Sequence, residues 1–153
     1  MIRGLHHVGI VTSDLERAKR FYCGVFGFEV YSESEWRADN AMFNTIIAME
    51  GSAARFCMLK GPNTYLELFE FISPGSSVDP ARLQPSDQGL RHLMFEVDDV
   101  LETWSKVKEY GGIVMNPPVD VPGGPCVTYC RDPFGNLIEL ARPAGRMPSL
   151  EAL

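Results

Sequence analysis

Two histidines and two glutamates stand at matching places in the two halves of this chain, and their residue types suit a divalent metal ion. The four residues are His7, Glu67, His92 and Glu139. The segment LHHVGIVTSDLE around the first histidine corresponds to RHLMFEVDDVLE around the second, and each glutamate stands in an aliphatic–Glu–Leu triplet. Imidazole and carboxylate together bind Zn, Ni, Co, Fe or Mn, and ligand type alone does not choose among them. We predict that this His–Glu quartet binds one divalent metal ion.

Strand geometry predicts which side chains accompany the glutamates. Side chains two residues apart in a strand share a face, so Glu67 shares its face with three aromatic residues. These are Tyr65, Phe69 and Phe71. A carboxylate in an otherwise apolar strand is costly to bury unless its charge is neutralised, which a metal ion would do. Adjacent residues of a strand point to opposite faces, so we expect His6 to lie on the other face and not to be a ligand.

Each half of the chain has the pattern of a βαβββ module. Residues 1–72 form the first module and residues 90–142 the second, and the Pro-, Ser- and Gly-rich segment 73–89 is the predicted linker. The tail 143–153 has little pattern, and we expect it to be mobile. The sequence therefore predicts an α+β fold built from two copies of one unit.

The predicted helix of each half begins at a capping box. Ser13 with Glu16, and Asp99 with Glu102, have the required spacing. The first half carries 13 more residues between its histidine and its glutamate, 60 against 47. Segment 38–50 is the surplus, and its apolar residues at helical spacing predict a short extra helix. This helix could wall a pocket or only add packing to the core, and the sequence leaves both roles open.

Composition excludes several classes of function. The 153 residues fit one compact domain or two small halves, and a net charge of -6 argues against nucleic-acid binding. No apolar run approaches the length of a membrane helix, so we expect no membrane partner. The four cysteines lack CxxC spacing, and strand geometry puts Cys126 and Cys130 about 13 Å apart, too far for a disulfide. We therefore expect a cytoplasmic protein with free thiols.

These motifs resemble the vicinal oxygen chelate superfamily, which includes glyoxalase I, methylmalonyl-CoA epimerase, extradiol dioxygenases and the fosfomycin and bleomycin resistance proteins. The resemblance covers residues 4–142 and is carried by LHHVGIVTSDLERAKRFYCGVFGFEV, YLELFEF, GLRHLMFEVDDV and YCRDPFGNLIEL. It implies that the two βαβββ modules form an open, cup-like mixed sheet with the helices outside and the quartet as metal ligands inside. It also implies a homodimer, in which the modules pair within one chain or swap between two.

Departures from individual members narrow the chemistry. Glyoxalase I has an Arg and an Asn contacting glutathione where this chain has Val11 and Phe71, so glutathione recognition is not expected. Extradiol dioxygenases require a histidine several residues before the position of Tyr129, and this chain has none there. Glu50 lies near the place of the second catalytic acid of methylmalonyl-CoA epimerase, with a surface glutamate as the alternative.

The resemblance implies a metal-dependent isomerase or lyase, glyoxalase-like or acyl-CoA epimerase-like, that moves a proton next to a carbonyl through a metal-bound enediolate or enolate. Glu139 or Glu67 would act as the base on a small-molecule substrate. The predicted pocket has apolar and aromatic walls made by Tyr65, Phe69, Phe71, Met94 and Tyr129. The alternatives are a non-catalytic drug- or aromatic-ligand-binding protein of the resistance type and an extradiol dioxygenase. Neither the substrate nor the metal is indicated by the sequence.

Overall fold

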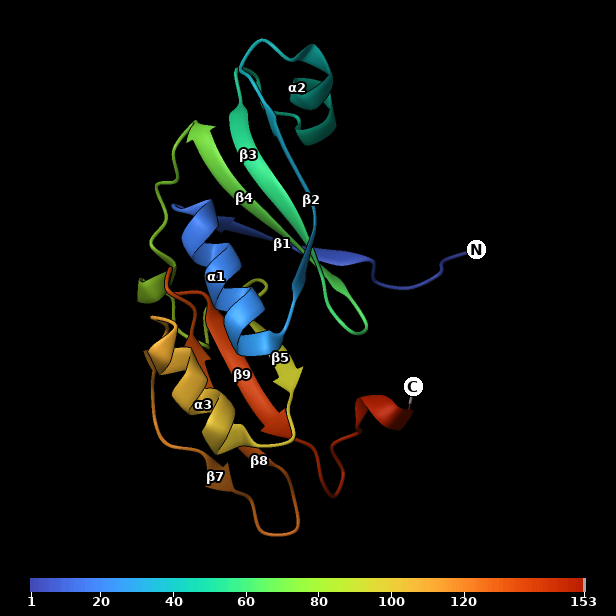
Figure 1. Cartoon of the computed structure of the whole chain (residues 1–153), viewed down its shortest axis with the longest axis vertical. Coiled ribbons are helices and arrows are strands. Elements are labelled where there is room, and N and C mark those ends of the chain that lie inside the picture. The colour runs from blue at the N-terminus through green and yellow to red at the C-terminus, as the bar shows by residue number, and fades with distance from the viewer. Residues whose placement is uncertain (153) are drawn as a thin grey trace. The chain divides into compact units, whose positions relative to one another are not determined.

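The computed structural model describes residues 1–152, which divide after Val78 into two compact units (Figure 1). Each unit contains its own mixed sheet and one long helix, so the predicted α+β class is confirmed. The division falls inside the segment 73–89.

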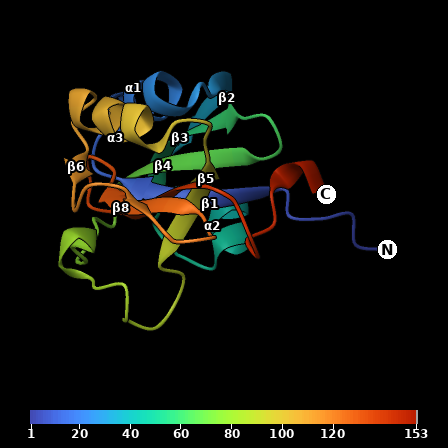
Figure 2. The ribbon, with the colours of Figure 1, turned by 90° about the horizontal axis from the view of Figure 1, so that it is seen from below.

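The first unit has a four-stranded sheet with the order β1-β4-β3-β2, in which β1 and β4 are parallel and the other pairs antiparallel. Its elements are β1 (His7–Thr12), α1 (Leu15–Phe26), β2 (Glu29–Trp36), α2 (Ala41–Ile47), β3 (Ala53–Lys60) and β4 (Tyr65–Ser73). Helix α2 lies within the surplus segment 38–50. Figure 2 shows α1 and α2 on opposite faces of this sheet.

The second unit repeats this plan with shorter strands. Its sheet has the order β5-β9-β8-β6, and β7 also pairs with β8. Its elements are the 3-10 helix η1 (Pro80–Arg82), β5 (His92–Glu96), α3 (Val100–Glu109), β6 (Ile113–Val114), β7 (Val119–Asp120), β8 (Cys126–Arg131), β9 (Leu137–Arg142) and the 3-10 helix η2 (Leu150–Ala152). As in the first unit, the strand that carries the histidine runs parallel to the strand that carries the glutamate.

Alternation along β4 separates a core face from an open face. Leu66 and Leu68 are fully buried beside α1, whose Phe21 and Tyr22 are also fully buried. Glu67, between the two leucines, points to the other face and keeps part of its surface exposed. Burial of the leucines therefore fixes the direction of the carboxylate, because a slip of one residue would exchange the two faces.

Both long helices begin at an aspartate, and this corrects one predicted cap. Asp99 accepts a hydrogen bond from the Glu102 amide, as predicted. In the first unit the cap is Asp14, which accepts from the Arg17 amide, and Ser13 lies one residue too early. The shared capping residue makes the internal repeat more regular than predicted.

The ends of the second unit are tied to its sheet. The buried Arg131 side chain donates hydrogen bonds to the carbonyl oxygens of Pro80 and Leu83, so η1 packs on the second unit and is more than a linker. In the tail, the Ser149 hydroxyl and the Leu150 amide donate to the carboxylate of Glu96 on β5.

All four cysteines lie within the described residues, and all are free thiols. None of the helices formed by residues 1–152 has the length and apolar character needed to cross a membrane.

Candidate metal site

The first unit brings His7 and Glu67 together on the open face of its sheet. His7 begins β1, and its Nε2 atom lies 3.2 Å from Oε2 of Glu67 in the neighbouring β4. Gly9 stands opposite Glu67 in the strand register. Because Gly9 has no side chain, the imidazole two residues before it can reach along the strand to the carboxylate.

The second unit forms the equivalent pair. Nε2 of His92 at the start of β5 lies 3.0 Å from Oε2 of Glu139 in β9. Met94 and Tyr129 are the residues opposite Glu139 on its two neighbouring strands. The structure therefore assembles the predicted quartet as two His–Glu pairs, one in each unit.

Tyr129 is a hydrogen-bond donor to the second pair, a role that its predicted place as a pocket wall did not include. Its hydroxyl donates to Oε2 of Glu139 over 3.0 Å, and its ring meets His92 edge-on at 5.4 Å between centroids. Burial raises the pKa of Tyr129, and the hydrogen bond to Glu139 and its negative charge raise it further. The hydroxyl therefore stays protonated at neutral pH and holds the carboxylate in place.

The charges and donor atoms of the two pairs fit a divalent cation. The side chains of Glu67 and Glu139 are only 18% and 13% exposed. Across residues 1–152, neither carboxylate is paired with a lysine or an arginine. Burial of a carboxylate without a full compensating charge is unfavourable, and a metal ion would supply that charge. Within either unit, as far as it is described, no third His, Cys, Asp or Glu completes a metal-binding group.

His6 lies where the strand geometry did not place it. Its Nδ1 atom is 2.9 Å from Nδ1 of His7, and its ring stacks on Tyr65 at 5.0 Å between centroids. The expected opposite orientation is wrong because β1 begins only at His7, so the alternation of a strand does not extend to His6. His6 is positioned to fix which nitrogen of His7 carries the proton.

Aromatic residues crowd the open face of the first sheet beyond Glu67. Phe69 stacks with Phe56 and with Phe71, and Trp36 packs edge-on against Phe71. Phe43 of α2 stacks on Trp36 at 4.5 Å between centroids, so α2 covers this end of the open face. Both functions considered for the surplus segment thus meet in one helix, which adds core packing and walls the face that carries Glu67.

Glu50 lies in the turn after α2 and is exposed. Asn44 donates a hydrogen bond from Nδ2 to Oε2 of Glu50 over 3.2 Å. This contact agrees with the surface alternative that the sequence left open.

The turn between β8 and β9 positions Glu139 from a distance. Asp132 is fully buried and accepts hydrogen bonds from the amides of Phe134 and Asn136 and from the Asn136 side chain. This turn sets the start of β9 at Leu137, two residues before Glu139. Arg131 and Asp132 were not identified as site residues from the sequence, although a charged pair directly after the apolar segment CVTYC was a signal.

Comparison with known proteins identifies relatives over nearly the whole chain. A sequence model of the Glyoxalase/Bleomycin resistance protein/Dioxygenase superfamily matches residues 4–140. A 2-epi-5-epi-valiolone epimerase of Actinomyces sp is 33% identical over 151 residues, covering 92% of this chain and 80% of that protein. The ethylmalonyl-CoA/methylmalonyl-CoA epimerase of Cereibacter sphaeroides is 28% identical, covering 92% of this chain and 98% of that protein.

Solved structures show the same fold at lower sequence identity. A glyoxalase family protein of Bacillus cereus superposes with a TM-score of 0.84 at 20% identity, covering 95% of this chain and 97% of that one. The fosfomycin resistance protein FosX of Listeria monocytogenes, crystallised as a variant with Mn(II) and 1S,2S-dihydroxypropylphosphonic acid, has a TM-score of 0.62 at 20% identity and covers 99% and 94% of the two chains.

Proposed function

Because this chain belongs to the Glyoxalase/Bleomycin resistance protein/Dioxygenase superfamily, we propose that it is a metal-dependent isomerase or lyase that moves a proton next to a carbonyl group. The observation that carries the proposal is the pair of equivalent His–Glu contacts, 3.2 and 3.0 Å long, one in each unit. Two curated relatives named as epimerases support the reaction class. Epimerisation next to a carbonyl requires a proton to be removed from one side of a carbon and returned to the other.

The proposed ligands of the divalent ion are the quartet itself, two imidazole nitrogens and two carboxylate oxygens. When bound, the ion would act as a Lewis acid that polarises the substrate carbonyl and stabilises negative charge on its oxygen. Zn, Ni, Co, Fe and Mn all accept this donor set.

Glu139 is the proposed base. Its carboxylate would take the proton from the carbon next to the carbonyl, which requires the two to come within hydrogen-bond reach. The Tyr129 hydroxyl, 3.0 Å from Oε2, holds that carboxylate in one orientation. Tyr129 and Met94, beside Glu139 in the strand register, would limit access of water. Glu67 is the alternative base, with His7 as its contact.

Metal content is the first test of this function. Protein freed of metal by a chelator and refilled should hold one ion per chain by elemental analysis if the quartet supplies a single site. Glu67→Gln and Glu139→Gln should each weaken binding, whereas Glu29→Gln, on the exposed edge strand β2, should not. Two ions per chain would contradict a shared site, and a protein that holds no divalent ion would contradict the enzyme proposal.

Solvent exchange tests the chemistry. In D2O, the metal-loaded protein should replace the proton next to the carbonyl of a true substrate, followed by NMR over a panel of small oxo acids, hydroxy ketones and acyl-CoA thioesters. Glu139→Gln, with its metal content measured first, should abolish the exchange. Exchange at the wild-type rate in a variant that has kept its metal would refute Glu139 as the base.

A non-catalytic binding protein is the second candidate, because the aromatic cluster of Trp36, Phe56, Phe69 and Phe71 suits a ligand with flat rings. Tight binding of an aromatic drug without any solvent exchange would favour this candidate. We also propose, from the family resemblance, a homodimer in the cytoplasm. Light scattering after size-exclusion chromatography measures the mass, and a monomer would contradict the dimer.

A further inference from the structure

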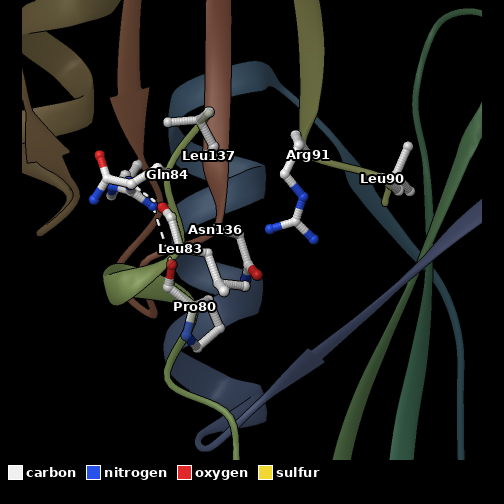
Figure 3. Close-up of a pocket in the computed structure, with 8 residues that line it drawn as sticks. Pro80, Leu83, Gln84, Leu90, Arg91, Asn136 and Leu137 are labelled. Carbon is white, nitrogen blue, oxygen red and sulfur yellow. Dashed lines mark hydrogen bonds between the residues drawn. The ribbon is translucent and has the colours of Figure 1, made fainter. Parts of the chain in front are cut away.

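A cavity of about 100 Å³ opens in the second unit, apart from the hydrogen bonds of the His92–Glu139 pair (Figure 3). Its walls come from three segments: η1 and the loop that follows it, the residues just before β5, and the turn between β8 and β9. None of the residues proposed above to bind the metal or to move the proton lines this cavity. Four apolar residues, two arginines and two residues with side-chain amides line the cavity. Among the residues that the structure describes, no acidic side chain is part of this lining.

Arg91 is the unusual member of the lining. Its Nε atom is buried and has no hydrogen-bond partner within residues 1–152. Figure 3 shows its side chain leaving the chain just before β5, with the guanidinium group directed to the side of the cavity where Asn136 lies. A guanidinium group with a desolvated and unsatisfied N–H favours an anionic partner. The cavity is where such a partner would fit.

Arg131 adds a second positive charge and fixes the wall. It is 7% exposed, and its guanidinium group donates hydrogen bonds to the backbone oxygens of Pro80, Leu83 and Gly135. The carboxylate of the neighbouring Asp132 accepts hydrogen bonds from the turn that follows it. Arg131 therefore holds η1 in place as one side of the cavity.

The size of the cavity and its apolar lining limit the chemical class of ligand that it can bind. A cavity volume of about 100 Å³ suits an anion of only a few heavy atoms. Leu83, Leu137 and Pro80 offer aliphatic contact that an inorganic anion could not use. A carboxylate can accept two parallel hydrogen bonds from a guanidinium group while its short hydrocarbon part meets the leucines.

The cavity also adjoins the second His–Glu pair along the sheet. Arg91 directly precedes His92, and Leu137 is both the register partner of His92 and two residues before Glu139 on the same strand. We propose that this cavity binds the carboxylate of a short aliphatic acid. Under the proposed function, on which this last step rests, that group is the substrate's own carboxylate, which makes the substrate an organic acid.

Binding of propionate to the chelator-treated full chain tests the site without any metal or turnover. We expect saturable shifts of amide signals from the residues around Arg91 and the β8–β9 turn in NMR titrations. Arg91→Gln should weaken the affinity about tenfold or more, and Arg91→Lys should weaken it less, because lysine keeps the charge but loses the paired hydrogen bonds. Arg146→Gln, the same charge change at an exposed position of the same unit, should change it less than about twofold.

Two comparison ligands test whether the cavity recognises a carboxylate. A native-like NMR spectrum of each variant shows that the variant is folded. Propionamide, which lacks the charge, should bind at least about tenfold more weakly than propionate. Affinity for inorganic phosphate equal to that for propionate would overturn the assignment to a carboxylic acid, and unchanged propionate binding by Arg91→Gln would overturn the site. Neither result depends on metal content or solvent exchange, so this inference and the proposed function fail by different measurements.

Discussion

Replacing Asp132 by alanine is expected to destabilise the second unit strongly. The Asp132 side chain is fully buried and accepts hydrogen bonds from the Phe134 amide at 2.9 Å, from the Asn136 amide at 2.9 Å and from the Asn136 side chain at 2.8 Å. A hydrogen bond to a charged group contributes about 1.5–3 kcal/mol, and water that reaches the turn would recover roughly half of the sum. We expect a net loss of about 3 kcal/mol in the free energy of unfolding.

The asparagine variant separates the contribution of the two backbone hydrogen bonds from that of the hydrogen bond with the Asn136 side chain. Asp132→Asn keeps an oxygen for the two backbone amides but places an NH2 group against the side-chain NH2 of Asn136. It should therefore cost about 1–2 kcal/mol, between the wild type and alanine. Asp120→Ala is the matched control, because its side chain is 82% exposed and its ion pair with Arg142 is 3.8 Å long. A surface pair of this kind contributes about 0–1 kcal/mol.

Urea unfolding measures these differences. Tryptophan fluorescence, which comes from Trp36 in the first unit and Trp104 in α3 of the second, and circular dichroism both follow the whole chain. With a slope of about 1–2 kcal/mol/M, a loss of about 3 kcal/mol lowers the midpoint by roughly 2 M. If Asp132→Ala unfolds at the same urea concentration as Asp120→Ala, the turn is not held by these hydrogen bonds and the reasoning is refuted.

Three further changes test other parts of the fold. Gly135→Ala should cost about 2–3 kcal/mol in thermal or urea unfolding, because φ is +93° and a Cβ would lie 2.5 Å from the backbone of η1, whereas Gly75→Ala meets nothing within 4 Å and should be nearly neutral. Burial raises the pKa of the Cys130 thiol to about 12, so the unfolded chain loses this proton first and stability should fall as the pH rises from 9 towards 12. By this linkage the wild type should lose about 1 kcal/mol more than Cys130→Ala between pH 7 and pH 10, and equal losses would contradict it. Asp99→Ala should cost about 1 kcal/mol in the same unfolding assay through loss of the cap on α3, and no change would show that the cap is replaced.

Much of the fold could be predicted because its signals are local. The period of two along β4 placed Glu67 opposite the buried Leu66 and Leu68, and the structure has the same alternation. Helical spacing and a capping aspartate located α3 and its first residue. The single misplaced cap, Ser13 for Asp14, arose because both residues accept hydrogen bonds well and one position separates them.

Residues in loops could not be placed in this way. His6 was assigned by strand alternation although it precedes the strand, and its stacking on Tyr65 depends on a partner nearly sixty positions away. The docking of η1 on Arg131 likewise joins segments about fifty residues apart. The hydrogen bonds from Arg131 depend on which backbone oxygens remain without a partner after the sheet has formed, and no local sequence pattern indicates which oxygens these are.

The amino-acid sequence by itself determined the repeat, the α+β class and the identity of the His–Glu quartet, because spacing and side-chain period are properties of neighbouring residues. Only the tertiary structure decided that each histidine meets its glutamate within one unit, that Tyr129 donates to Glu139, and that Arg91 borders a cavity. These features depend on strand pairing, on the packing of loops and on the burial of single atoms. All three arise only when distant parts of the chain come together.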